Sequence, residues 1–233
     1  MLIDADPFSD GANTRLNASP SIRTSTSAAL PIHTRDLGCV DYQQSYDAMR
    51  RFNAERDADT ADELWLLEHP PVYTLGQAGK PEHLLRRTDI PVVHVDRGGQ
   101  ITYHGPGQVV IYTLIDLKRR GIGIRDMVRR IEQSVIDLLV ERHIDAERVA
   151  GAPGIYVGGA KIAALGLRVR NGRCYHGVAL NVDVDLSPFE NINPCGYPGL
   201  AVARTIDLGV EQSATEVGHA LVRHIAAQIQ TAV

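Results

Sequence analysis

A cysteine stands where its thiol could act as a nucleophile, in the middle of residues 191–199 (NINPCGYPG). Two prolines fix φ on either side of Cys195, and two glycines permit turns that other residues resist. No regular helix or strand tolerates this composition, so we expect a tight, well-shaped loop. The alternative is a free cysteine packed as a small hydrophobic residue, which is the usual fate of this residue type.

A second stretch with chemical potential is residues 97–108 (RGGQITYHGPGQ), which holds four glycines. Glycine at this density lets the backbone approach a ligand closely, and Arg97 and His104 bracket it with polar groups. His104 could orient a substrate or make a structural hydrogen bond. The stretch is not a phosphate loop, because it lacks Gly-Lys-Ser/Thr and no helix starts where its glycines end. A glycine-rich hairpin of purely structural use is the alternative.

Two further polar residues fall on predicted strands. Alternation along residues 161–169 puts Lys161 on the same side as Ala163, Leu165, Leu167 and Val169. A lysine on an apolar face is unusual, although it could be an edge lysine at a fraying strand start. On the following strand His176 alternates with Val178, Leu180 and Val182, which predicts a core histidine.

Length and composition indicate an ordinary globular domain. The chain has 233 residues, 44% hydrophobic and 22% charged, which suits one domain of α/β size. A net charge of −4 indicates neither nucleic acid nor a membrane surface as a partner, and no apolar run is long enough to span a bilayer. Three widely spaced cysteines without a Cys-x-x-Cys pair argue against a disulfide framework or a metal site and favour a reducing compartment. We therefore expect a cytoplasmic protein without a bound metal.

The chain divides into a tail and one domain. Residues 17–30 are mostly Ser, Thr, Ala and Pro without apolar periodicity, so residues 1–33 are expected to be a disordered tail and residues 34–233 a single folded domain. Short β runs are predicted at residues 36–40, 63–68, 72–75, 92–95 and 109–114, and a three-stranded meander at residues 155–157, 161–169 and 174–184. Apolar periodicity predicts helices over residues 42–56, from Ile124 to Leu139 and after a capping box at residues 213–216. Without a regular βαβ rhythm, these elements predict an α/β domain of the α+β type, with a mixed, largely antiparallel sheet flanked by helices.

Several motifs together resemble one family. They are residues 97–108, residues 159–166 (GAKIAALG), residues 193–197 (NPCGY), residues 175–181 (YHGVALN) and residues 186–189 (LSPF). In order and separation this set is similar to the lipoyl(octanoyl) transferases, and the likeness covers roughly residues 35–210. The resemblance implies the fold of the biotin and lipoate protein ligases. It also implies an enzyme that moves an octanoyl group from acyl carrier protein to a lysine of a lipoyl domain.

The family resemblance also implies roles for individual residues. A cysteine that carries the acyl group as a thioester maps to Cys195, and the lysine that assists it maps to Lys161. Octanoate binding maps to Arg97, Gly98, Gly99, Gln100, Ile101, Thr102, Tyr103, His104, Ala164, Leu165, Gly166, Gly177, Val178 and Ala179. No cofactor is implied, because the acyl group arrives on the phosphopantetheine of acyl carrier protein. The expected acceptors are apo lipoyl domains of 2-oxoacid dehydrogenase complexes and the glycine cleavage H protein, and a monomer is expected.

A two-step mechanism follows from these residue types. The thiolate is the reactive form of cysteine, and a nearby ammonium favours it, which gives Lys161 a first role. Lys161 would then give a proton to the departing pantetheine thiol and later take one from the incoming amine. Candidate oxyanion donors are backbone N–H groups around Cys195 or in the loop at Gly98 and Gly99. Two other functions stay open: an ATP-dependent lipoate or biotin protein ligase of the same fold, and a non-catalytic module that binds lipoyl domains or carrier protein.

Overall fold

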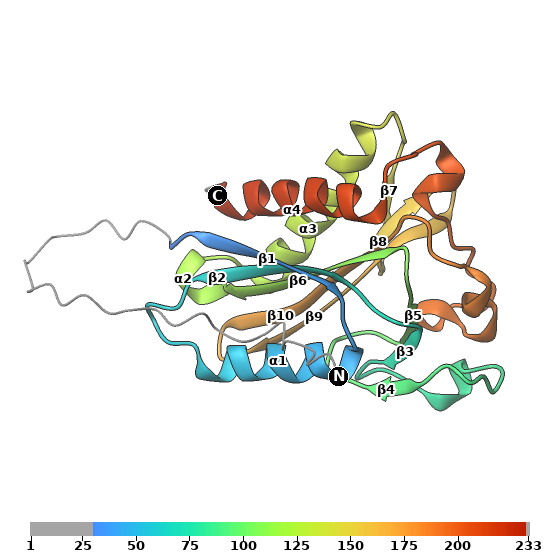
Figure 1. The fold of residues 1–233 in the computed structure, drawn as a ribbon, viewed down its shortest axis with the longest axis horizontal. Coiled ribbons are helices and arrows are strands. Elements are labelled where there is room, and N and C mark those ends of the chain that lie inside the picture. Colours follow the sequence, from blue (N-terminus) through green and yellow to red (C-terminus); the bar gives the residue numbers. More distant parts are fainter. Residues whose placement is uncertain (1–29, 232–233) are drawn as a thin grey trace, which may run out of the picture.

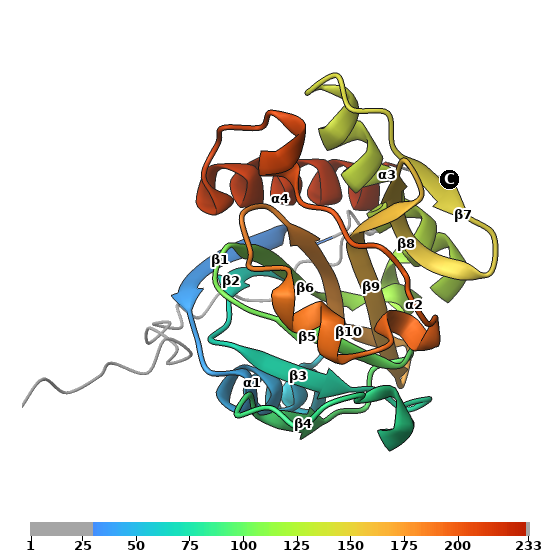
Figure 2. The same ribbon diagram turned by 90° about the vertical axis from the view of Figure 1, so that its right-hand side faces the viewer.

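The computed structural model describes residues 30–231, except for the side chain of Cys195, so the expected tail of residues 1–33 lies almost wholly outside the described residues (Figures 1 and 2). The strands are β1 (Ile32–Cys39), β2 (Asp62–Glu68), β3 (Val72–Leu75), β4 (Val92–His94), β5 (Ile101–His104), β6 (Gln108–Asp116), β7 (Glu147–Val149), β8 (Ala152–Val157), β9 (Ala160–Arg170) and β10 (Arg173–Asn181). The helices are α1 (Tyr42–Glu55), α2 (Leu117–Arg120), α3 (Ile124–Val140) and α4 (Ala214–Gln230). Short 3₁₀ turns are η1 (Pro81–His83), η2 (Ser187–Asn191), η3 (Pro194–Gly196) and η4 (Thr205–Leu208).

The strands form two sheets. Seven strands follow the order β1-β2-β6-β10-β9-β8-β7, and three more follow the order β4-β3-β5. Among the described residues β1 and β2 pair in parallel, as do β3 and β4, while the remaining pairs are antiparallel. The predicted mixed, largely antiparallel α+β fold is confirmed. The division into two sheets was not predicted.

Helices cover both faces of the large sheet, with α3 and α4 on one side and α1 on the other (Figures 1 and 2). Strand β6 lies in the sheet between these two helix layers, and its side chains point alternately toward one layer and the other. Val109, Ile111 and Ile115 pack with α3 and α4, whereas Val110, Tyr112 and Leu114 pack with α1. This two-sided burial explains why β6 reads as a continuous apolar run.

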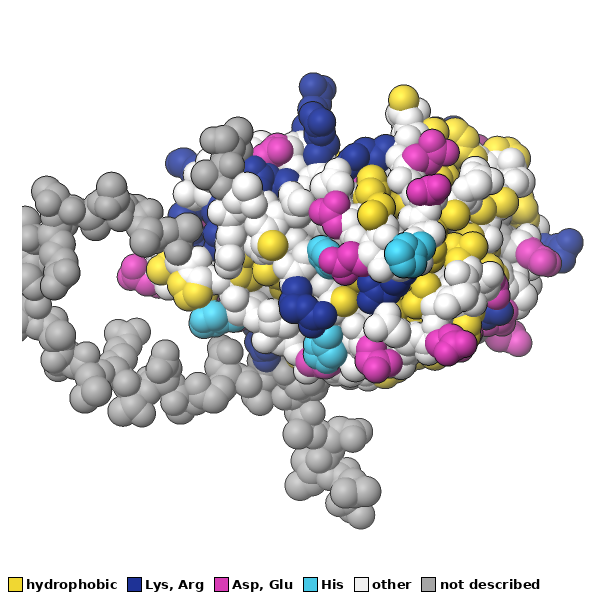
Figure 3. Space-filling view, turned by 90° about the horizontal axis from the view of Figure 1, so that it is seen from above, with side chains coloured by type: hydrophobic (Ala, Val, Ile, Leu, Met, Phe, Trp, Pro, Cys, Tyr) yellow, Lys and Arg dark blue, Asp and Glu magenta, His cyan; other side chains and the backbone are white. Residues whose placement is uncertain are grey.

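The helices begin where their capping residues predict. The Asp41 side chain accepts from the Gln44 backbone N–H at 3.1 Å, and Ser213 and Glu216 form a reciprocal capping box at the start of α4. Ile124 departs from the predicted buried stripe of α3, since it is the first residue of the helix and remains 54% exposed. The outer surface of the α3 and α4 layer intersperses acidic and basic side chains (Figure 3). No helix within residues 30–231 has the length and apolar character to cross a membrane.

The predicted three-stranded meander is confirmed as β8, β9 and β10. Its two turns lie at Gly158 and Gly159, with φ of 56° and 82°, and at Asn171 and Gly172, with φ of 54° and 80°. Two consecutive positive φ values match the tight hairpin turns whose twist suits antiparallel strands. The meander places residues of β9 and β10 side by side, from Ala163 opposite Leu180 to Arg170 opposite Arg173.

The small sheet lies over the α1 side of the meander and brings the glycine-rich segment to it. Strand β5 belongs to the small sheet and β6 to the large one, so the alternative of a simple glycine-rich hairpin is wrong. The Gly98 N–H donates to the Leu167 carbonyl at 3.1 Å. A Cβ on Gly166 would lie 3.0 Å from the Gly98 carbonyl oxygen, so glycine permits this close approach of loop and strand.

Candidate active site

Lys161 lies near the start of β9, with only 4% of its surface exposed. Its backbone N–H donates to the Ala201 carbonyl at 2.8 Å, and its own carbonyl accepts from the Ala203 N–H at 3.0 Å. Residues 201–203 therefore run alongside the strand at this point, and they follow the cysteine loop directly. The main chain itself joins the two segments that carry the predicted nucleophile and lysine.

The Lys161 side chain rests on β8. A Cβ built on Gly154 would lie 2.5 Å from Lys161 Cε and 3.2 Å from its Nζ, so the lysine occupies the space above this glycine. The Nζ atom lies 5.3 Å from the centre of the Tyr156 ring, within the range of a cation–π contact. Glu132 Oε1 accepts from the Gly154 N–H at 3.2 Å and holds this part of β8 against α3. Gly154 and Tyr156 thus form the surface on which the Lys161 side chain rests, and we call this surface its seat.

The orientation of Lys161 differs from the one that regular alternation predicts. The pairing of β8 with β9 shifts between Ile155 and Tyr156, which face Ala163 and Lys161 respectively, so Ile162 is an extra residue on β9. Ile162 and Ala163 both pack into the core beneath α3 and α4. A bulge of this kind breaks the period of two. Lys161 lines a small cavity together with Ala163 and Ala164, whereas Ile162 packs into the core.

The cysteine loop is anchored on both sides of η3. The Asn193 N–H donates to the His83 carbonyl at 2.9 Å, and the Gly196 N–H donates back to the Asn193 carbonyl at 2.9 Å. Gly196 has a φ of 80°, which glycine adopts without strain. Pro194 lines the same small cavity as Lys161, Thr102 and Ala164, so the loop that carries Cys195 borders the lysine. The predicted tight loop is confirmed, while the Cys195 side chain lies outside the described residues.

The other two cysteines have poor environments for a nucleophile. Cys174 is buried in the main core, where burial raises the pKa of its thiol to about 12. Cys39 is an exposed residue at the end of the edge strand β1. Partial burial of its thiol, together with the nearby Glu68 carboxylate, raises the pKa of this thiol. Because the thiolate is the reactive form, neither residue is set up to attack an acyl group.

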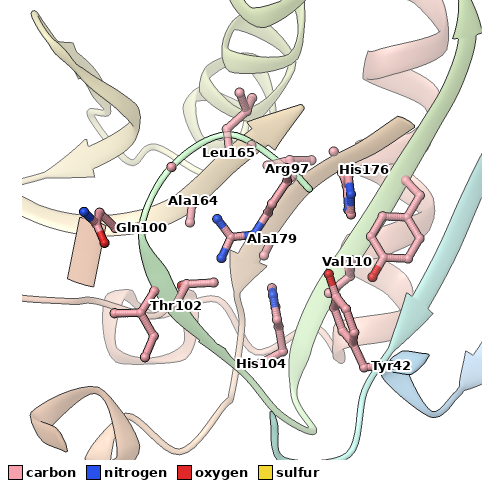
Figure 4. A pocket seen from close by; sticks show the side chains of 16 residues that line it. Tyr42, Arg97, Gln100, Thr102, His104, Val110, Ala164, Leu165, His176 and Ala179 are labelled. Atoms are coloured by element: carbon pink, nitrogen blue, oxygen red, sulfur yellow. The ribbon is translucent and has the colours of Figure 1, made fainter. Parts of the chain in front are cut away.

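A larger cavity of about 520 Å³, open to solvent at its mouth, runs along the α1 side of β9 and β10. It shares Thr102 and Ala164 with the small cavity beside Lys161, so the two cavities adjoin at these residues. Figure 4 shows Gln100, Thr102 and Ala164 at one end of the cavity and His176 and Tyr42 at the other. Twelve of the fourteen residues expected to bind octanoate line it. Gly98 instead bonds to β9, and Tyr103 packs beneath η2 against Phe189.

The charged and imidazole groups of this cavity are tied to the protein. The Arg97 guanidinium donates to the Thr74 carbonyl and to Thr74 Oγ1, both at 2.8 Å. His104 lies within hydrogen-bond distance of Gln108 Oε1 through Nδ1, at 2.7 Å, and of Thr74 Oγ1 through Nε2, at 3.3 Å. Burial, with the neighbouring His69, lowers the pKa of His104 to about 3, so its ring is neutral at physiological pH. The cavity therefore holds a neutral, structural imidazole at this position.

The glycine N–H groups named as possible oxyanion donors are mostly engaged elsewhere. Gly98 donates to Leu167, and Gly196 donates to Asn193 within its own turn. Either group would have to break a backbone hydrogen bond before it could bind a developing oxyanion. The composition of the loops indicated these groups, whereas their hydrogen-bond partners depend on the tertiary structure.

The sequence comparisons agree with the geometry of this site. Residues 41–226 match the family model of the lipoyl protein ligase A/B catalytic domain. The octanoyltransferase of Thiobacillus denitrificans is 62% identical over 202 residues, which cover 87% of this chain and 92% of that protein. The octanoyltransferase of Dechloromonas aromatica is 62% identical over 200 residues, 86% of this chain and 98% of its own length.

The chain belongs to the octanoyltransferase family. Its fold extends more widely, since a lipoate-protein ligase A bound with ATP superposes with a TM-score of 0.67 at 18% identity, covering 86% of this chain and 85% of the ligase. The biotin protein ligase of Aquifex aeolicus superposes with a TM-score of 0.50 at 12% identity, covering 86% of this chain and 69% of the ligase. The predicted family is confirmed, and so is the predicted kinship of fold.

Some residues of this octanoyltransferase site carry no recognisable sequence signal. Tyr42, Val110, Tyr112 and His176 also line the large cavity. Periodicity predicts that Tyr42 is buried under the helix, but only the fold shows that the cavity lies beneath it. Gly154 also lacks a sequence signal, because only the fold shows that the Lys161 side chain packs against this strand glycine.

Replacing Gly154 with alanine is expected to reduce octanoyl transfer about a hundredfold, because the new methyl group would displace Lys161 from its seat. Gly154 has a φ of 129°, and the added Cβ would also lie 2.5 Å from the Ala163 carbonyl oxygen. The matched control is Gly151→Ala, at a φ of 79° with no atom within 4 Å of the added Cβ. Both variants carry backbone strain, but only Gly154→Ala adds contacts with Lys161 and the Ala163 carbonyl, so the comparison of kcat/KM per folded molecule measures the effect of filling the seat. Equal activity of the two variants would contradict the seat.

Proposed function

We propose that this octanoyltransferase accepts an octanoyl group from acyl carrier protein on Cys195 and passes it to a lysine of a lipoyl domain. The observation that supports the proposal most directly is the small cavity in which Lys161 meets Pro194 of the cysteine loop. This cavity adjoins the larger one at Thr102 and Ala164. The loop that carries Cys195, the Lys161 side chain and a channel lined with small residues thereby lie next to one another.

In the first step the Cys195 thiolate attacks the carbonyl carbon of the octanoyl pantetheine thioester. A new carbon–sulfur bond forms, the bond to the pantetheine sulfur breaks, and the Lys161 ammonium gives its proton to the departing thiolate. In the second step the acceptor lysine amine attacks the enzyme thioester. Lys161 takes the proton from the attacking nitrogen, an amide forms, and the Cys195 thiolate is released.

The seat on β8 supports both roles of Lys161. Lys161 Nζ lies 5.3 Å from the centre of the Tyr156 ring, which keeps its amine beside the cavity, and an ammonium group there would stabilise a neighbouring thiolate. The stem lies against Gly154 and holds the amine at the cavity. Since a thioester is already activated and an amide is more stable, the scheme needs neither nucleotide nor metal. Among the described residues no group of three His, Cys, Asp or Glu side chains is arranged to hold a metal ion.

Room for a straight acyl chain comes from the small residues of β9 and β10. Ala164 pairs with Ala179 and Gly166 pairs with Gly177, so the residue pairs on either side of the Leu165–Val178 pair carry no large side chain. The stem of Arg97 covers Gly166, since a Cβ there would lie 3.2 Å from Arg97 Cδ. The open path therefore runs over Ala164 and Ala179 toward Gly177.

An ATP-free transfer assay tests this function. The enzyme is incubated with octanoyl-acyl carrier protein and an apo lipoyl domain, and the intact masses of both proteins are followed. We expect one octanoyl group on the enzyme before the acceptor is added, and on the acceptor afterwards. Transfer that requires ATP and free octanoate would instead assign the reaction of the ligases that share this fold. Binding without any acyl adduct would exclude the covalent scheme.

A further inference from the structure

The end of the large cavity farthest from Lys161 is closed by rings. His176 and Tyr112 line the cavity at this end, and Tyr42 of α1 lies beside them (Figure 4). His176 pairs with Leu167, three residues along β9 from Ala164, where the large cavity meets the small one. Three strand residues span about 10 Å. An extended eight-carbon chain, with carbon–carbon bonds of about 1.5 Å, has about the same length.

His176 reaches this place through an irregular backbone. Regular alternation would put its ring with Val178 and Leu180 in the core beneath α3 and α4, as the sequence predicts. Its φ is 61°, in the left-handed region, and the ring lies instead on the α1 side. It stacks on Tyr46 at 5.5 Å and on Tyr175 at 5.1 Å between ring centres. The predicted burial of His176 is confirmed, but the predicted face, shared with Val178, is wrong, because the positive φ turns the side chain into the cavity wall.

This arrangement carries two local energetic costs. A non-glycine residue held at positive φ is conformationally strained. His176 Nε2 lies 3.0 Å from Asp96 Oδ1, while Nδ1 is buried without a hydrogen-bond partner among the described residues. Because the Asp96 carboxylate can only accept, Nε2 carries the hydrogen and Nδ1 keeps an unshared lone pair. Glycine would adopt this backbone without strain. The strained conformation therefore serves only to place the histidine ring at the cavity.

The ring is held rigidly from behind. Asp96 also accepts from the Tyr175 hydroxyl, so the carboxylate fixes both stacked rings. Burial alone would raise the pKa of Asp96, but its hydrogen bonds from His176 and Tyr175 outweigh burial and lower it, so the carboxylate stays charged. Tyr175 on the far side of His176 lines a separate surface hollow between α1 and the turn after β9. A wall of two pinned rings thus separates the acyl cavity from this hollow.

From these features we infer that His176 is the specificity-determining residue that limits the acyl chain to about eight carbons. The inference rests on the proposed function, because it assumes that the acyl chain lies in the large cavity with its carbonyl near Lys161. Two further methylene groups would have to displace a ring that Asp96 and two tyrosines hold in place. One extra methylene in a fitted pocket lowers kcat/KM about 10- to 200-fold, so a decanoyl chain is strongly disfavoured.

The test is the variant His176→Gly, which relieves the positive φ and removes the wall. We expect the ratio of kcat/KM for decanoyl over octanoyl carrier protein to rise at least about tenfold. The smaller asparagine tolerates positive φ, so His176→Asn is expected to give an intermediate rise. The matched control is His143→Gly, since His143 also has a positive φ, 58°, but is exposed in the turn after α3. This control should keep the chain-length ratio of the unchanged enzyme.

The acyl adduct on the enzyme is measured by intact mass in the same experiment, before any acceptor is added. A folded His176→Gly enzyme that acylates with octanoyl but rejects decanoyl as strongly as the unchanged enzyme would overturn the inference. An unchanged enzyme that forms no octanoyl adduct would overturn the proposed function instead. Should His176→Gly fail to fold, a ratio for His176→Asn equal to that of the unchanged enzyme would overturn the inference as well.

Discussion

Replacement of Cys195 with alanine is expected to lower octanoyl transfer by about three orders of magnitude or more, because the nucleophile of both steps is lost. The octanoyl adduct should disappear from the intact mass of the enzyme. The fold should survive, since the substitution removes a single sulfur atom from a loop that backbone hydrogen bonds of Asn193 and Gly196 hold in shape. Thermal unfolding of the variant checks this point.

The matched control for this experiment is Cys39→Ala, which removes the exposed thiol at the end of β1. Its adduct and its turnover should equal those of the unchanged enzyme. Cys174 makes a weaker control, because it is fully buried and its thiol donates to the Thr113 carbonyl. A stable octanoyl adduct on Cys195→Ala would show that another group carries the acyl chain, and the covalent scheme would fall.

Replacement of Lys161 with alanine is expected to cost about two to four orders of magnitude in turnover, the usual contribution of a positioned acid–base group. The variant also loses an ammonium that favours the Cys195 thiolate, so alkylation of this thiol by iodoacetamide at neutral pH should slow. Lys161→Met keeps a long stem over Gly154 and Tyr156 and removes only the charge. Comparison of the two variants separates chemistry from packing.

Both Lys161 variants should form little adduct and pass on still less. If Lys161→Met turns over at the normal rate, the lysine has no part in proton transfer. If turnover falls while alkylation of Cys195 is unchanged, Lys161 acts as the acid and base alone and does not stabilise the thiolate. Measuring both quantities on the same samples decides between these outcomes.

Much of the fold follows from local patterns in the sequence. The capping residues Asp41 and Ser213 mark the starts of α1 and α4, and the pairs at Gly158 and Asn171 mark the meander turns. These signals depend on short-range chemistry that a single sequence displays. The division of strands into two sheets depends on long-range pairing, for which periodicity carries no information.

Most residues of the candidate site could be predicted from the sequence, but the sheet faces toward which their side chains point could not. The extra residue Ile162 and the positive φ of His176 each reverse the face that alternation assigns, the first for Lys161 and the second for His176 itself. Both are backbone irregularities inside strands, and nothing in the residue types announces them. Each irregularity turns a polar side chain out of the main core and into the cavity. The failures of alternation therefore fall at the site itself.

The hydrogen bonds that flank the cysteine loop also determine how this site can vary. Asn193 is fixed to His83 on one side, and Ala201 and Ala203 are fixed to Lys161 on the other, all through main-chain atoms. The loop is thus held at both ends by main-chain hydrogen bonds, which do not depend on the side chains that it carries. Tyr197, Pro198 and Gly199 in this loop are exposed. Substitution of Tyr197 or Pro198 is therefore expected to leave the backbone path of the loop unchanged.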